Sequence, residues 1–238
     1  MKNLVEGLVM KLLLGVVALS VCLLGCEPVV NQTTSPIVAQ EFDYVLAVVV
    51  DMSGSFSAEM QSGNGRAYKF LMRAVDLFFR NRIGEGNDRI IVSQVSGTQS
   101  ALLWDGTPRG LREHFSSAKA FEKFLLERSN GAGSRIHDGV RETIEYVMDM
   151  PGVSSGKTRT FVMVLSDMDD NFAEPSASRE KLVNSLKAYS KVGGVAGIYW
   201  CNQQHVPGWR RDLKDCGFKS CVVESDIVAD PALPVFDN

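Results

Sequence analysis

The chain has 238 residues, of which 45% are hydrophobic, 22% charged and 8% aromatic. These fractions are close to those of an average globular protein, so they exclude an intrinsically disordered chain, a collagen-like repeat and a membrane protein with several spans. With 25 Lys and Arg residues against 28 Asp and Glu residues, the formal net charge is −3. We expect no nucleic-acid partner, because binding to nucleic acid requires a basic surface and the sequence contains no stripe of basic residues.

The N-terminal 26 residues contain a short apolar run that ends at a cysteine. An apolar run over residues 12–24 is too short for a membrane-spanning helix of roughly 20 residues, but it suits the hydrophobic region of a secretory signal. The run ends in Leu-Leu-Gly-Cys at residues 23–26, which resembles the lipobox of bacterial lipoproteins. This resemblance implies a signal peptide over residues 1–25 and lipid attachment at Cys26. The alternatives are an ordinary cleaved signal peptide and an uncleaved anchor.

The resemblance also suggests where the protein is located. Residue 27 is Glu rather than the Asp that retains lipoproteins in the inner membrane of enteric bacteria. We therefore expect a lipid-anchored protein of the bacterial cell envelope, on the outer membrane and facing the periplasm if the host has two membranes. Residues 26–41 contain two prolines and no periodic apolar pattern, which predicts a lipidated cysteine followed by a flexible tether. Residues 42–238 are then one domain.

The remaining cysteines suit an oxidising compartment but leave the pairing open. Cys201, Cys216 and Cys221 are three in number, so at most one disulfide can form among them, and any of the three pairings is possible. A zinc site is the competing interpretation. It is disfavoured because the spacing lacks the closely spaced cysteine pairs that are typical of zinc sites.

Apolar runs and helical periodicity predict the elements of the domain. Residues 44–50 form a continuous apolar run rich in β-branched residues, which is typical of a strand buried on both faces. The link at residues 96–99 is short enough for a hairpin between two strands. The predicted strands are residues 44–50, 89–95, 100–104, 159–166, 194–200 and 220–224. The predicted helices are residues 65–82, 110–128, a helix from the glycine-rich turn at 131–134 to about 148, 176–192 and 209–216.

Alternation of strands and helices predicts the fold class. Parallel strands need crossover connections, which helices of about 15 residues supply on both faces of a sheet. We therefore expect a doubly wound α/β domain with a mostly parallel six-stranded sheet. The one hairpin makes a single antiparallel edge strand.

Acids and hydroxyls follow the predicted strands where ligands bind in such folds, at the carboxyl ends of the strands. Asp51, Ser53 and Ser55 follow the first strand. Ser134 precedes the mid-chain helix, and Asp167 follows the fourth strand. All five offer oxygen, the ligand atom preferred by Mg²⁺, Mn²⁺ and Ca²⁺. They would leave one coordination position open, which a carboxylate of a partner protein could fill.

The pattern resembles the von Willebrand factor A family. Residues 51–55 match that family's metal-ion-dependent adhesion site, D-x-S-x-S, and residues 42–224 follow its element order, including the antiparallel edge strand. Two departures are Ser134 where the family has threonine and Met168 where it commonly has glycine. The resemblance implies that the metal is contacted by Ser53, Ser55 and Ser134, and is bound directly or through water by Asp51 and Asp167.

These observations predict a binding module rather than an enzyme. Its cofactor would be Mg²⁺, or Mn²⁺ or Ca²⁺, and its partner an envelope or extracellular protein that supplies a carboxylate. One alternative is a metal-free scaffold whose polar loops cap helices, with Ser134 as an N-cap. Another is a phosphohydrolase resembling the haloacid dehalogenases, with Asp51 as nucleophile. It is disfavoured because Ser53 stands where such enzymes need a general acid.

Two further acidic features are weaker signals. Asp169 and Asp170 suit either electrostatic support of Asp167 or an ordinary loop. His137 and Asp138 lie in the first turns of a predicted helix, where a His–Asp pair can serve acid–base chemistry. A surface pair is the commoner arrangement, and we expect one here.

Overall fold

The structure is a computed structural model that describes residues 41–61, 63–81, 87–95, 100–129, 133–171 and 175–233. The predicted signal peptide, Cys26 and all but the last residue of the predicted tether lie outside these residues. Within the described part, no helix combines the length and apolar character needed to cross a membrane.

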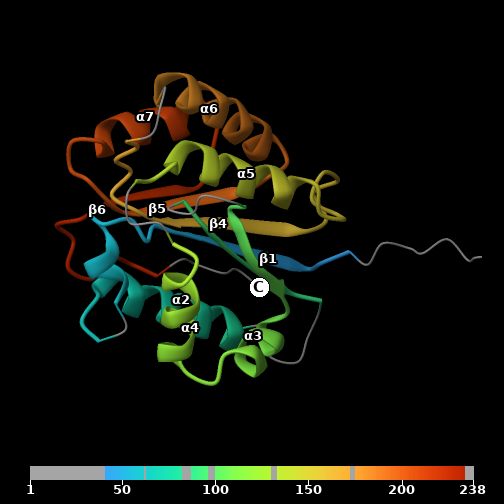
Figure 1. The fold of residues 1–238 in the computed structure, drawn as a ribbon. Helices are drawn as coiled ribbons and strands as arrows, with labels where there is room; N and C mark the ends of the chain where they lie inside the picture. Colours follow the sequence, from blue (N-terminus) through green and yellow to red (C-terminus); the bar gives the residue numbers. More distant parts are fainter. Residues whose placement is uncertain are drawn as a thin grey trace, which may run out of the picture. The chain divides into compact units, whose positions relative to one another are not determined.

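A six-stranded sheet forms the centre of the domain, in the order β3-β2-β1-β4-β5-β6 (Figure 1). Neighbouring strands run parallel except for β2 and β3, which pair in antiparallel fashion at the edge. The predicted fold class is therefore confirmed. The strands are β1 Tyr44–Val50, β2 Arg89–Gln94, β3 Leu102–Gly106, β4 Arg159–Leu165, β5 Val195–Cys201 and β6 Cys221–Ser225.

Helices cover both faces of the sheet (Figure 1). One face carries α2 Arg66–Asn81, α3 Pro108–His114 and α4 Ala118–Leu126, and the other carries α5 Ile136–Met148, α6 Pro175–Lys191 and α7 Val206–Asp215. A short 3-10 helix, η1 Ser57–Met60, lies between β1 and α2. Each face thus has its own apolar layer between sheet and helices.

One predicted helix is wrong. Residues 110–128 form α3 and α4 with a break between them, because each of these helices has its own capping side chain. The Thr107 hydroxyl accepts a hydrogen bond from the Gly110 N–H at 3.0 Å, and the Ser117 hydroxyl accepts one from the Ala120 N–H at 3.1 Å. Such N-caps start a new helix even where the apolar pattern continues.

The central strand β1 explains the unbroken apolar run. Its side chains alternate between the two apolar layers, with Val45, Ala47 and Val49 facing one and Leu46 and Val48 facing the other. All five are fully buried. A strand covered by helices on both faces has no solvent side, so it shows no polar alternation.

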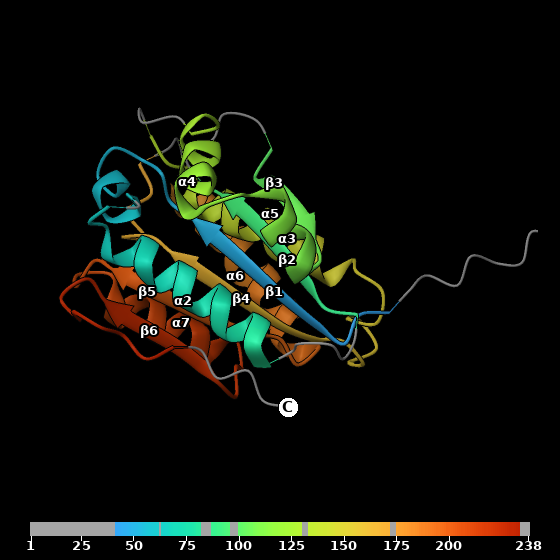
Figure 2. The same ribbon diagram turned by 90° about the horizontal axis from the view of Figure 1, so that it is seen from below.

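The register of the sheet brings several loops to one edge. Val50 at the end of β1 pairs with Leu165 at the end of β4, and Leu165 pairs with Tyr199 near the end of β5. The loop after β1 leads from its arrowhead through η1 to α2 (Figure 2). The residues that follow these strands therefore meet at the carboxyl edge of the sheet.

Candidate cation site

Asp51 is the most buried member of the predicted site. It follows β1, and its carboxylate is held on both oxygens. Oδ1 accepts the Ser53 N–H at 2.8 Å, and Oδ2 accepts the Ser166 hydroxyl at 2.9 Å. The residue is fully buried. Its orientation is therefore set by β1, by the turn that follows and by the end of β4.

Four of the five predicted residues lie together. The Ser53 and Ser55 hydroxyl oxygens are 3.3 Å apart, and the Ser55 hydroxyl donates to Asp167 Oδ2 at 2.9 Å. Asp167 lies in the loop after β4, so this contact joins two loops that are 112 positions apart in the sequence. Together with the Asp51–Ser53 hydrogen bond, it makes a continuous chain of contacts from Asp51 to Asp167.

Ser134 lies at the same edge of the sheet, but the hydrogen bonds of the described residues do not link its hydroxyl to the other four. It is buried and directly precedes Arg135, whose N–H donates to the carbonyl oxygen of Val95 at 2.9 Å. Val95 in turn donates to the carbonyl oxygen of Val50 at 3.1 Å. The alternative role of Ser134 as an N-cap is wrong, because Arg135 occupies the N-cap of α5.

The electrostatics of the site favour a bound positive charge. Burial raises the pKa of Asp51 above its usual value, and the negative charge of Asp167 raises it further, while hydrogen bonds from Ser53 and Ser166 oppose the shift. An ionised, buried carboxylate is costly unless a cation or hydrogen bonds compensate for it. The negative charge of Asp167 therefore adds to the cost of ionising Asp51, and a cation beside Asp51 would lower that cost.

The donor set fits a hard cation. Carboxylate and hydroxyl oxygens are ligands for Mg²⁺ and Ca²⁺ and are poor ligands for softer metals. The described residues contain no cluster of three or more His, Cys, Asp or Glu side chains that could hold a metal. A cation here would therefore depend on serine hydroxyls for much of its protein ligation.

Sequence reasoning missed Ser166. This fully buried residue follows β4, donates to Asp51 Oδ2 and accepts the Met168 N–H, each at 2.9 Å. It therefore joins the Asp51 carboxylate to the loop that carries Asp167. The sequence signal that could have indicated this role is the position of Ser166, a small polar residue between the apolar strand β4 and the predicted ligand Asp167.

We expect Ser166→Ala to destabilise the protein by about 1–3 kcal/mol, because it leaves a buried carboxylate oxygen and a backbone N–H without their partner. Loss of this hydrogen bond also raises the pKa of Asp51 further, since the bond opposes the shift. Urea denaturation of the two proteins measures the difference. Ser155→Ala is the matched control, because the Ser155 hydroxyl bonds an exposed turn carbonyl. An equal loss in both variants would contradict the role of Ser166.

Met168 adopts the left-handed backbone conformation that glycine adopts without strain. Its φ is 61°, and its side chain is buried in the apolar layer on the α5 face of the sheet. This conformation costs an ordinary residue about 1–2 kcal/mol. The buried side chain and the hydrogen bond to Ser166 hold it in place. Met168 therefore makes the same left-handed turn that a glycine could make at this position.

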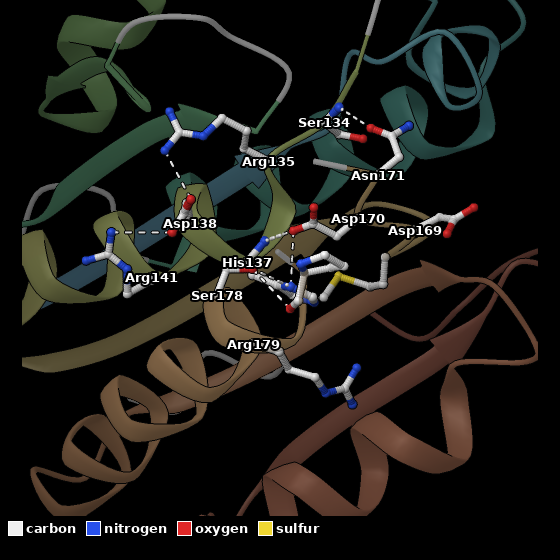
Figure 3. A network of polar contacts seen from close by, with 12 residues as sticks. Ser134, Arg135, His137, Asp138, Arg141, Asp169, Asp170, Asn171, Ser178 and Arg179 are labelled. Atoms are coloured by element: carbon white, nitrogen blue, oxygen red, sulfur yellow. Dashed lines mark hydrogen bonds and ion pairs between the residues drawn. The ribbon is translucent and has the colours of Figure 1, made fainter. Parts of the chain in front are cut away.

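The expected surface pair of His137 and Asp138 is wrong. His137 is buried, and its Nδ1 lies 3.1 Å from Asp170 Oδ2 and 3.2 Å from the Ser178 hydroxyl (Figure 3). Asp138 points elsewhere and accepts a hydrogen bond from Arg135 at 3.0 Å. A Ser–His–Asp relay needs the acid and the serine on opposite ring nitrogens, whereas here both contact the same one.

The three cysteines of the domain are free thiols in the structure. Cys201 and Cys216 are buried, and each thiol lies 3.6 Å from a backbone carbonyl oxygen. Burial raises the pKa of Cys201 to about 12 and also raises the pKa of Cys216 and of the exposed Cys221. Raised thiol pKa values lower the reactivity of all three.

Comparisons with known proteins leave the family open. No protein-family model and no curated protein matches the chain. A similar solved structure is proximal thread matrix protein 1 from the mussel byssus, with 14% identity over 78% of this chain and 44% of that one and a TM-score of 0.44. Another is the pilus adhesin SpaC from Lactobacillus rhamnosus GG, with 14% identity over 79% of this chain and 29% of that one and a TM-score of 0.49. The chain spans less than half the length of either protein, and neither likeness carries a functional argument.

Proposed function

We propose that the domain binds a divalent cation at the carboxyl edge of its sheet and, through that cation, a carboxylate of another protein. The single observation that carries this proposal is the chain of contacts from buried Asp51 through Ser53 and Ser55 to Asp167. In this cluster the negative charge of Asp167 adds to the cost of ionising the buried Asp51 carboxylate. A cation bound beside Asp51 would offset that cost.

The proposed ligands are the residues implied by the resemblance to the von Willebrand factor A family. Ser53, Ser55 and Ser134 would contact the cation, and Asp51 and Asp167 would bind it directly or through water. With few charged ligands, the bound cation keeps positive charge, which attracts an acidic group of a partner. Mg²⁺ is the first candidate, with Mn²⁺ and Ca²⁺ as alternatives.

The proposed setting is the bacterial cell envelope. Attachment of lipid to Cys26 would hold the domain near a membrane surface, on a short tether. A lipid-anchored domain that binds an acidic group of an envelope or extracellular protein would serve adhesion or assembly. In this proposal the protein is a binding module and not an enzyme.

The phosphohydrolase alternative fits the geometry less well. A nucleophilic aspartate has to present an oxygen to its substrate, whereas Asp51 is fully buried and accepts a hydrogen bond on each oxygen. The metal-free scaffold remains the second candidate. It differs from the main proposal in one measurable property, the response to a divalent cation.

Thermal unfolding in the presence and absence of Mg²⁺ tests the proposal. A ligand at 100 times its Kd stabilises a protein by about 2.7 kcal/mol, which corresponds to roughly 5–10 °C for a domain of this size. We expect a shift of that order at saturating Mg²⁺, reversed by a chelator, and a parallel calorimetric titration gives the affinity. No shift at millimolar Mg²⁺, Mn²⁺ or Ca²⁺ would favour the scaffold.

A further inference from the structure

The start of α5 is capped from outside the helix. A helix leaves its first N–H groups without partners inside the helix, and a side chain at the N-cap usually satisfies one of them. The N-cap residue of α5, Arg135, has no capping side-chain hydrogen bond. Its own N–H donates to the carbonyl oxygen of Val95, directly after β2, and the His137 N–H donates to Asp170 Oδ2 at 2.9 Å.

The loop between β4 and α6 therefore supplies the cap, and it is the loop that carries Asp167. Next to Asp170, Asn171 Oδ1 accepts the Ser134 N–H at 3.0 Å (Figure 3). Gly133 leaves room for this approach, since a Cβ atom there would lie 3.2 Å from the same Asn171 oxygen, which is closer than ordinary van der Waals contact. Two consecutive side chains of one loop thus hold two backbone N–H groups at the start of α5.

The His137 side chain also contacts the loop between β4 and α6. His137 Nδ1 lies 3.1 Å from the same Asp170 oxygen, and both side chains are buried. The same Nδ1 atom lies 3.2 Å from the Ser178 hydroxyl at the start of α6. The negative charge of Asp170 also lies at the N-terminus of α5, where the helix dipole favours it. Asp170 is thus held by the His137 N–H, by the His137 ring and by the helix dipole of α5.

We propose that Asn171 and Asp170 are positioning residues, which hold Ser134 in register with the Asp167 loop. Asn171 binds the Ser134 N–H directly, and Asp170 caps α5 at the His137 N–H. The inference rests on the proposed function for the role of Ser134 as a ligand. It adds that the fifth proposed ligand is placed by a contact between loops, because no hydrogen bond among the described residues joins the Ser134 hydroxyl to the other four. Cation affinity then depends on Asn171, although this side chain is not itself a proposed ligand.

Asn171→Ala tests this inference, because it removes the acceptor without changing any charge. Outer side chains that orient ligands typically change metal affinity by 10–100-fold, so we expect Mg²⁺ affinity, measured by calorimetry, to fall about tenfold. Asn171→Asp keeps an acceptor oxygen and should recover most of the affinity. Thr107→Ala is the matched control: it removes a side-chain acceptor from the Gly110 N–H at the start of α3 and should leave the affinity unchanged.

Amide hydrogen exchange in the absence of cation gives a second readout. We expect the Ser134 amide to exchange at least several times faster in Asn171→Ala than in the unmodified protein. If the unmodified protein binds Mg²⁺ and Asn171→Ala binds it equally well, the positioning role is overturned while the proposed function stands. If the unmodified protein binds no divalent cation, the proposed function fails and the positioning role fails with it. Unchanged exchange of the Ser134 amide overturns the Asn171 contact on which the inference rests.

Discussion

Asp51→Asn should abolish stabilisation by Mg²⁺ while leaving the cation-free protein at least as stable as the unmodified one. The substitution keeps the shape of the side chain and an oxygen for the Ser53 N–H, but it removes the buried negative charge. Without a cation that charge is unfavourable, because burial and Asp167 both raise its pKa. With a cation it is a ligand. We therefore expect the Mg²⁺-induced shift in melting temperature, roughly 5–10 °C in the unmodified protein, to vanish.

The same comparison has a defined pH dependence. Because the folded-state pKa of Asp51 is raised, the folded protein takes up this proton at a higher pH than the unfolded chain, whose value is near 3.8. The unmodified, cation-free protein gains stability from this group as pH falls through the folded-state pKa, and the gain is complete below the unfolded value. The stability advantage of Asp51→Asn should therefore shrink on acidification from pH 7.

Either of two results would count against this account. A Mg²⁺ shift that survives in Asp51→Asn would place the cation elsewhere in the protein. The other result is a cation-free Asp51→Asn protein that is less stable than the unmodified protein by about 2 kcal/mol or more, the scale of a lost buried hydrogen bond. That result would mean that the hydrogen bonds of Asp51 stabilise the fold more than the burial of its charge destabilises it. Chemical denaturation in a chelator separates these outcomes.

Trp209→Ala should cause the largest loss of stability among single substitutions on the α5 face of the sheet. Trp209 in α7 is 1% exposed and packs against the Arg179 guanidinium, whose carbon lies 4.1 Å from the ring, and against His137. Truncating a buried aromatic side chain to alanine typically costs about 3–5 kcal/mol, because the cavity is only partly refilled. We expect a fall in melting temperature of roughly 10 °C.

Ile227→Ala is the control for loss of an apolar side chain. Ile227 is 67% exposed, so its truncation should change the free energy of unfolding by less than about 0.5 kcal/mol. A loss below about 1 kcal/mol in Trp209→Ala would contradict the packing of α7 against α5 and α6. Because Trp209 contacts His137, this variant should also speed amide exchange at the start of α5, in addition to global destabilisation.

The sequence by itself determined the order and type of nearly all strands and helices, and hence the fold class. This succeeded because burial on two faces forces an unbroken apolar run such as β1, and because one-sided burial forces the periodicity seen in α2. The same rule placed Asp51 and Asp167 at one edge of the sheet, since the carboxyl ends of parallel strands meet there. That a cation binds there stays a prediction.

The tertiary structure alone decided the features that depend on close approach between loops. Ser166 behind Asp51, the buried position of His137 and the Asn171 contact with Ser134 all arise from segments far apart in the sequence. The break between α3 and α4 was local but was missed, because a continuing apolar pattern outweighed the capping residues Thr107 and Ser117. Periodicity reports which face of an element is buried. It carries no information about which side chains of other loops satisfy the polar groups at its ends, because those hydrogen bonds depend on packing in three dimensions.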